Sequence, residues 1–265
     1  MVTAKQIAEY LQKVPPLPDA LKKTLAALEA GDLAGAAKEA AQEQAMIYYL
    51  RRTVNSAAFG FRNELKEVPQ IFSALGIQRA KQLLYAYMVS VTAPEKWGYF
   101  DLSSEDFARF QVEMMSKWQA LLEALEGEER FLSAAALVTA GLVVADAIFA
   151  DRKQDVELLT SMEDLPLDTI LERVSGMRFG ALVNEIAKKW EADADVAEVV
   201  ALALSAGPCD ASELTCRLAK ALHLLLFYEL SRPAMMKAGA NGFVPFDPAF
   251  VEEVYETFAQ KVELA

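Results

Sequence analysis

The sequence predicts an all-α protein, and three observations support this fold class. Hydrophobic residues make up 54% of the 265 residues and charged residues 24%, so the chain has enough apolar surface for a sizeable buried core. It contains only 12 Gly and 10 Pro, which does not favour a β-rich protein. Apolar residues recur at helical spacing along most of the chain, and no strand alternation competes with them. We therefore expect ten or more helices joined by short turns.

The first hundred residues read as a series of short helices. Residues 1–14 mix charged and apolar residues at helical spacing, and they lack the uninterrupted apolar stretch of a secretory signal. The prolines of residues 15–18 open the next helix, whose apolar positions are Leu21, Leu25 and Leu28. Gly76 is expected to interrupt a later helix after Ile71 and Leu75, and the pattern resumes at Leu83, Leu84, Tyr87 and Met88.

Helix starts are expected at Ser103–Asp106 and at Asp193–Asp195, because side-chain oxygens cap free N–H groups and the helix dipole favours acids there. The irregular stretch 239–248 precedes a last amphipathic helix around Phe250, Val254 and Phe258. No linker is long enough to free a domain. We expect a body over residues 1–207 and a C-terminal helical part over residues 208–265 packed on the same body.

Residues 131–150 raise the question of a membrane span, since about 20 residues with almost no charge are long enough to cross a bilayer. Asp146 argues against insertion, because an Asp at the centre of a membrane helix costs about 2.5–3.5 kcal/mol. The many alanines supply little transfer free energy to offset that cost. The segment is therefore predicted to be a buried core helix, and no membrane is expected as a partner.

Charge and rare residues exclude several classes of function. A net charge of −12 and a pI near 4.7 argue against general affinity for nucleic acid or anionic membranes, which need clustered Lys and Arg. One His in the whole chain excludes every site that needs two imidazoles, and two Cys suit a reducing, cytoplasmic location. No GxxxxGK or GxGxxG is present, so no nucleotide phosphate cradle and no cofactor is predicted.

Several blocks of the sequence carry a family resemblance. In the first hundred residues they are Pro15-Pro16-Leu17-Pro18, Met46 with Leu50, Val54-Asn55-Ser56-Ala57, Ala74-Leu75-Gly76-Ile77-Gln78-Arg79 and Leu83-Leu84. Weaker blocks follow at Ala140-Gly141-Leu142-Val143, Gly180-Ala181 and Lys189-Trp190. Over about residues 11–207 this order and spacing resemble the HDOD family, a bacterial signalling output domain related to the HD phosphohydrolases. An Asp-Pro pair of that pattern is here Glu43-Gln44. The resemblance implies a two-lobed helical fold related to the HD superfamily.

The same resemblance indicates a degenerate metal site. HD enzymes hold metal ions with His and Asp side chains to activate water against a phosphoester. Their His-Asp pair would fall on Val144 and Ala145, a later Asp would fall on Lys220, and the His expected before Gly180 is absent. None of these side chains can bind a metal. Asp146 is one position out of register and has no other ligand near it in the sequence.

The resemblance therefore implies a non-enzymatic module of bacterial signal transduction that regulates signalling proteins through protein-protein contacts. Two alternatives stay open. One is a small-molecule or nucleotide-binding sensor that uses the Met- and Phe-rich interior as an apolar pocket. The other is a residual HD-type phosphohydrolase. The sequence does not identify the partner, and it leaves the formation of a homo-oligomer open.

Residues 51–81 contain six basic residues against two acidic ones in a chain of net charge −12. This segment is either a docking face for an acidic partner or a nucleotide, or a set of ordinary salt-bridge partners for the surrounding acids. The candidate interaction residues are Arg51, Arg52, Asn55, Ser56, Arg62 and Arg79. A helix stop before Gly60 also explains Asn55 and Ser56. The nearby aromatic residues have helical spacing and are expected in the core: Tyr48, Tyr49, Phe59 and Phe61.

Cys209, Cys216 and His223 recur at seven-residue intervals, which suggests a zinc site. Seven residues of helix rise about 10 Å, too far for ligands of one tetrahedral ion. If Cys209 lies in a loop the spacing changes, but three ligands with no fourth partner are still insufficient. We therefore expect all three to pack in the interior, with His223 buried and neutral within the apolar run 221–227. Acidic clusters at residues 123–129 and 151–157 are expected to be solvated helix faces rather than cation sites.

Overall fold

The computed structural model describes residues 18–56, 59–162 and 165–263 of the chain. Within these residues the structure contains thirteen α-helices and no strand, so the predicted all-α class is confirmed. The helix predicted for residues 1–14 lies outside the described residues. The chain divides into two compact units, which we call the N-terminal unit, Pro16–Val91, and the C-terminal unit, which begins at Thr92. The proposed division at residue 207 stays a prediction.

The N-terminal unit consists of α2 (Asp19–Glu29), α3 (Leu33–Ala40), α4 (Gln44–Val54) and all but the end of α5 (Val68–Thr92). The predicted apolar face of α2, with Leu21, Leu25 and Leu28, is buried, and α2 packs against α3. The Tyr87 hydroxyl on α5 donates a hydrogen bond to the Glu43 carboxylate at the start of α4. This contact connects α4 to the last helix of the unit.

Gly76 interrupts α5, as the sequence predicts. Its φ of 71° lies in the left-handed region, which glycine adopts without the steric cost that a Cβ atom would add. The segments on both sides of Gly76 stay helical.

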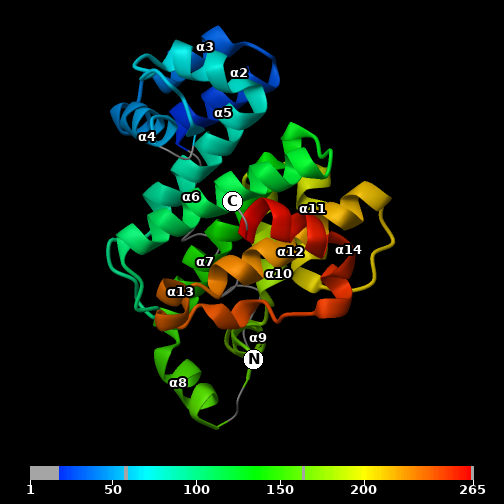
Figure 1. Ribbon diagram of the computed structural model, residues 1–265. Helices are drawn as coiled ribbons and strands as arrows, with labels where there is room; N and C mark the ends of the chain where they lie inside the picture. The colour runs from blue at the N-terminus through cyan, green and yellow to red at the C-terminus, as the bar shows by residue number, and fades with distance from the viewer. Residues whose placement is uncertain (1–17, 57–58, 163–164, 264–265) are drawn as a thin grey trace. The chain divides into compact units, whose positions relative to one another are not determined.

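The C-terminal unit contains the remaining nine α-helices of the described chain (Figure 1). They are α6 (Ser104–Ala124), α7 (Ala134–Asp151), α8 (Lys153–Met162), α9 (Leu167–Ser175), α10 (Phe179–Lys189), α11 (Ala194–Ser205), α12 (Glu213–Leu230), α13 (Pro233–Lys237) and α14 (Pro248–Phe258). Short 3₁₀ helices at Glu129–Ser133 and Asn241–Phe243 and a π-helical turn at Ala259–Glu263 complete it.

Helix α7 is the core of this unit and packs against α6, α9, α10 and α11. Of the described residues, Glu129–Asp151 is the one segment long and apolar enough to cross a membrane, but 94% of its apolar window is buried inside the molecule. This burial is what a core helix requires. At Gly141 a Cβ atom would lie 2.4 Å from Val183 Cγ2, so only glycine allows α10 to approach α7 this closely.

The helix starts agree with the sequence. Ser103 caps α6 by accepting a hydrogen bond from the Asp106 N–H at 3.0 Å. Helix α11 begins at Ala194, although Asp193 gives it no side-chain cap. The last α-helix, α14, begins after Asp247, which accepts hydrogen bonds from the Ala249 and Phe250 N–H groups. The predicted amphipathic helix around Phe250 is therefore present.

Candidate functional site

Asn55 and Ser56 end α4 and hold the loop that follows it. The Asn55 side-chain amide donates to the Arg51 carbonyl at 2.9 Å and to the Leu65 carbonyl at 3.0 Å, and its oxygen accepts from the Leu65 N–H at 2.8 Å. The Ser56 hydroxyl donates to the Thr53 carbonyl at 2.7 Å. These bonds satisfy the last carbonyls of α4 and fix the far end of the loop beside them.

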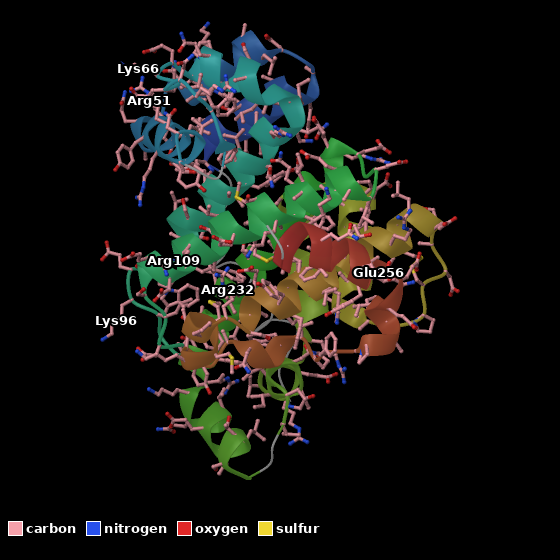
Figure 2. All side chains as sticks on the ribbon, viewed as in Figure 1. Arg51, Lys66, Lys96, Arg109, Arg232 and Glu256 are labelled. Atoms are coloured by element: carbon pink, nitrogen blue, oxygen red, sulfur yellow. A yellow bond between two sulfur atoms is a disulfide. The ribbon has the colours of Figure 1, made fainter. Side chains whose placement is uncertain are left out.

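This loop brings a group of exposed basic side chains to the end of α4. The Arg51 guanidinium lies 3.6 Å from the Glu67 carboxylate, and Lys66 lies 3.6 Å from Glu64. Arg52 and Arg62 are also exposed, and the part of the chain that the structure describes offers neither of them an ion pair. Figure 2 shows Arg51 and Lys66 on the same side of this unit. We call Arg51, Arg52, Arg62 and Lys66 the basic surface.

Two aromatic side chains expected in the core are exposed instead. Tyr48 has 67% of its surface exposed and Phe61 has 37%. Tyr48 precedes Arg51 and Arg52 on α4 by three and four residues, so the three side chains share one helix face. The buried face of α4 carries Met46, Leu50 and Val54 instead. Helical spacing alone does not tell which face of a helix is buried, so the exposure of Tyr48 could not be predicted from it.

The other basic residues of the segment are placed differently. Arg79 is half-buried on α5. Lys81 is buried and pairs with Glu29 of α2 at 3.6 Å, so it serves as a structural ion pair within the unit. The structure therefore gathers Arg51, Arg52, Asn55 and Ser56 at one end of α4 and places Arg62 in the adjoining loop, whereas Arg79 is on another helix.

Charge is distributed unevenly between the two units. Pro16–Val91 carries nine basic and seven acidic residues, which leaves 17 basic and 31 acidic residues for the rest of the chain. The net charge of −12 therefore originates outside the N-terminal unit. A weakly positive unit on a strongly acidic chain keeps a local attraction for negative partners that the net charge conceals.

The positions predicted for a degenerate metal site lie on the core helix α7 and on α12. Val144 and Ala145 are buried in the middle of α7, and neither side chain has a donor atom for a metal. Lys220 on α12 forms an ion pair with Glu253 of α14 at 2.5 Å. Its ammonium therefore holds two helices together and repels any cation placed there.

Asp146, the one carboxylate beside these positions on α7, is already occupied. Only 2% of its surface is exposed. Its two oxygens accept hydrogen bonds from the N–H groups of Gly98, Tyr99 and Phe100, each at 2.9 Å. Three backbone donors satisfy the buried charge. This carboxylate holds the segment between α5 and α6 against the core helix.

The residues present do not fit the metal ion that HD enzymes require. Among the residues that the structure describes, no three His, Cys, Asp or Glu side chains are grouped so that they could hold a metal ion. The donor set at Val144, Ala145 and Lys220 is apolar or cationic. We derive no metal-dependent step from this site.

A cavity of about 250 Å³ lies beside Val144 in the C-terminal unit. No sequence pattern points to this cavity, apart from the run of small residues on α7. Its lining consists of Thr92, Pro94, Lys96, Gly98, Ala140, Val143, Val144, Asp146, Ala147, Ala150, Asp151 and Trp190.

The two cysteines form a disulfide, and the expectation that they only pack in the interior was wrong. Cys209 lies in the loop before α12 and Cys216 in the first turns of that helix, with Cα atoms 5.8 Å apart. The rise of about 10 Å over seven helical residues does not apply to this pair, because Cys209 lies in the loop and the loop brings it back beside Cys216. The same pairing removes them from any metal site with His223.

His223 is buried, as predicted, with 1% of its surface exposed. Its Nδ1 lies 2.7 Å from the Ala203 carbonyl oxygen and its Nε2 3.2 Å from that of Pro245, and its ring packs edge-on against Phe250. Burial lowers the pKa of the imidazole, and this outweighs the opposite effect of the two carbonyls. The histidine holds α11, α12 and the segment before α14 together.

A buried ion cluster between α6 and α12 was not predicted from the sequence. Glu229 is fully buried, and its carboxylate lies 2.5 Å from Lys117 Nζ and 3.4 Å from Arg232. Glu113 joins the same two cations at 2.9 Å and 3.4 Å. Burial alone would raise the pKa of Glu113, but the adjacent Lys117 and Arg232 bring it below its ordinary value. The cluster joins residues more than a hundred positions apart, which no local pattern reveals.

Comparison with known proteins agrees with this architecture. The sequence profile of the HDOD domain matches residues 14–205. No curated protein matches the chain. An HDOD domain protein of unknown function from Geobacter sulfurreducens superposes with a TM-score of 0.62 at 14% identity, covering 98% of this chain and 95% of that one.

Two proteins from Shewanella amazonensis also share the fold. One has a provisional phosphohydrolase name, a TM-score of 0.63 and 19% identity, with 96% of each chain covered. The other is provisionally named a metal-dependent phosphohydrolase and has a TM-score of 0.59 at 13% identity, covering 98% of this chain and 97% of that one. At these identities the superpositions establish the fold alone.

Proposed function

This chain belongs to the HDOD domain family, and we propose that it is a non-enzymatic regulatory module of bacterial signal transduction that acts through protein-protein contacts. The observation that carries the proposal is the chemistry of α7. Val144 and Ala145 stand where the HD metal pair would be, and the adjacent Asp146 carboxylate already accepts three backbone hydrogen bonds. A phosphohydrolase of the HD type needs ligands that these residues do not provide.

The basic surface is the contact site that we propose. Arg and Tyr are enriched at the energetic centres of protein interfaces, and Tyr48, Arg51 and Arg52 share one exposed face of α4. Asn55 fixes the loop that carries Arg62 and Lys66. A surface whose backbone is already ordered loses less conformational entropy when it binds.

The partner that fits this surface is an acidic protein segment. Arg52 and Arg62 have no ion pair among the described residues, so their charges are available to a partner. Arg51 already lies beside Glu67, and a partner must compete with that carboxylate. We therefore expect Arg52 and Arg62 to contribute more to association than Arg51.

The proposal that the chain is not an enzyme is tested by elemental analysis and activity assays. The purified chain is dialysed against a chelator, and its content of iron, manganese and zinc is measured. We expect less than 0.1 equivalent of each metal and no hydrolysis of phosphodiesters or nucleotides after metal is added back. One equivalent of retained metal together with metal-restored turnover would show that the chain is an HD-type phosphohydrolase.

The contact site is tested with charge reversals. A pull-down from the source cell with mass spectrometry identifies the partner, and its binding is then measured at two salt concentrations. Arg52→Glu and Arg62→Glu should slow association several-fold and weaken its salt dependence, because exposed interface charges act mainly on the association rate. Lys23→Glu, an exposed reversal on α2 of the same unit, should bind like the wild type. Wild-type rates in all the folded variants would place the interface elsewhere.

A further inference from the structure

The cavity beside Val144 has a floor of small side chains. Ala140, Val143, Val144, Ala147 and Ala150 occupy successive turns on one side of α7 and line the cavity. The space of about 250 Å³ is partly open to solvent, because Lys96, Gly98 and Asp151 of its lining are exposed. A small molecule can therefore reach the apolar side of α7 without local unfolding.

The opposite wall is held at a fixed distance. Asp146 binds the N–H groups of Gly98, Tyr99 and Phe100, which fixes this segment against α7. A Cβ atom at Gly98 would lie 2.5 Å from the Ala150 Cβ, so the backbone already touches the helix there. The cavity cannot close by a further approach of this segment, and it is preformed, as binding sites for small molecules usually are.

The lining selects an uncharged, mostly apolar ligand. Alanine and valine side chains and the Trp190 indole contribute most of its wall. Asp146 already shares its charge among three backbone donors, and Figure 2 shows the Lys96 side chain extending outward from its loop. Asp151, the remaining charged residue of the lining, is exposed like Lys96. The charged side chains therefore lie at the solvent side of the cavity, and placing a charged ligand against its apolar wall would be costly.

The size of the cavity limits the ligand. An apolar cavity of roughly 150 Å³ is known to take up benzene. A volume of about 250 Å³ suits a larger molecule with one or two rings, such as indole.

We propose that this cavity is a binding site for a small uncharged apolar molecule of about the size of indole, and that this ligand is the input of the module. The role of the ligand as an input rests on the proposed regulatory function. Binding of the ligand does not, because it can be measured with the purified chain alone.

The test uses indole as the probe, with the purified full chain and no partner. Addition of indole should raise the melting temperature in a saturable manner, since a ligand that binds only the folded state stabilises it. Amide NMR shifts should change near Gly98 and along α7. Ala147→Phe places a ring inside the cavity and should abolish both effects. Ala201→Phe makes the same change at an exposed position of α11 and should leave them intact.

Each outcome bears on the inference. If Ala147→Phe does not fold, Ala147→Val, which fills less of the space, should weaken indole binding several-fold. No saturable effect of indole on the wild type would overturn the inference, and so would wild-type binding by the folded Ala147→Phe or Ala147→Val variant. The partner assay with Arg52→Glu contains no indole, so failure of one proposal is distinguishable from failure of the other.

Discussion

The side-chain amide of Asn55 pairs with both backbone hydrogen-bonding groups of Leu65, ten residues further along the chain. One exposed side chain thus takes the place of a backbone partner and closes the loop after α4. Loop residues depend on such local bonds because they have few buried contacts. The order of the proposed docking surface therefore depends on this single side chain.

Asn55→Ala should release this loop without unfolding the unit. Two hydrogen bonds to Leu65 are lost, and their net contribution at an exposed site is about 1 kcal/mol. The Leu65 amide should consequently exchange with deuterium about fivefold faster, the factor that corresponds to this free energy. Native-state hydrogen exchange by NMR measures it.

The matched control is Asn63→Ala, an exposed asparagine in the same loop for which the described structure offers no hydrogen bond. It should leave the Leu65 exchange rate unchanged. Equal acceleration in both variants would mean that the loop is ordered by something other than the Asn55 side chain.

Asp146→Asn should lower the free energy of unfolding by about 3 kcal/mol. A charged acceptor that binds backbone donors in the interior contributes about 1.5–3 kcal/mol per bond, and the bonds are not additive. The amide keeps one acceptor oxygen but directs an NH₂ group at a backbone N–H. Urea unfolding of the purified chain measures the change.

Asp101→Asn provides the comparison for this experiment, since Asp101 is exposed and the described structure gives it no hydrogen bond or ion pair. Its free energy of unfolding should stay within about 0.5 kcal/mol of the wild type. An Asp146→Asn protein as stable as Asp101→Asn would show that the three backbone bonds contribute nothing to stability.

The sequence predicted those parts of the fold that depend on local chemistry. The buried face of α2, the break at Gly76 and the cap at Ser103 each follow from residues within one or two helical turns. The apolar run over α7 also predicted a core helix, because Asp146 argued against a membrane. Family motifs then identified the fold that these helices form.

The sequence could not predict which distant groups meet. An Asp within the apolar run of α7 indicates a buried carboxylate. Its hydrogen-bond donors, the N–H groups of Gly98, Tyr99 and Phe100, lie more than 45 residues away in the sequence. The Lys117–Glu229 pair spans 112 residues. The cavity beside Val144 results from how α7 packs against segments remote in the chain. Helical periodicity specifies which side chains share one face of a helix, but it does not specify which other segments of the chain pack against that face.

His223 should make the stability of the protein depend on pH. Burial lowers the pKa of its imidazole below the ordinary value of about 6.5. Below that pH the unfolded chain takes up a proton that the folded chain does not bind, so stability is complete above pH 6.5 and falls as the pH is lowered toward the folded pKa. The loss at pH 5.5 amounts to at most about 1.4 kcal/mol.

Urea unfolding at pH 8 and pH 5.5 checks this prediction when the wild type is compared with His223→Gln. The variant should be less stable at pH 8, because its shorter polar group replaces a packed ring, but it should lose less stability between the two pH values. Carboxylates titrate in both proteins, so the difference between the two losses isolates the imidazole. Equal losses would contradict the assigned direction of the pKa shift, and loss of partner binding by the folded variant would contradict its structural role.

The Cys209–Cys216 disulfide should stabilise the connection between α11 and α12. It closes a short loop with a sequence separation of 7, for which the chain-entropy estimate is about 2.5 kcal/mol. Dithiothreitol should therefore lower the melting temperature of the wild type by several degrees.

The double variant Cys209→Ser, Cys216→Ser supplies the control, because it should melt near the temperature of the reduced wild type and should not respond to dithiothreitol. A double variant that melts like the oxidised wild type would show that the disulfide does not stabilise the fold.

Alkylation of thiols in intact source cells, followed by mass spectrometry, measures whether the two cysteines are reduced or oxidised in the cell. The predicted cytoplasmic location requires both cysteines to be alkylated there, since that compartment keeps thiols reduced. Cysteines protected from alkylation would place the chain in an oxidising compartment and would contradict the cytoplasmic prediction.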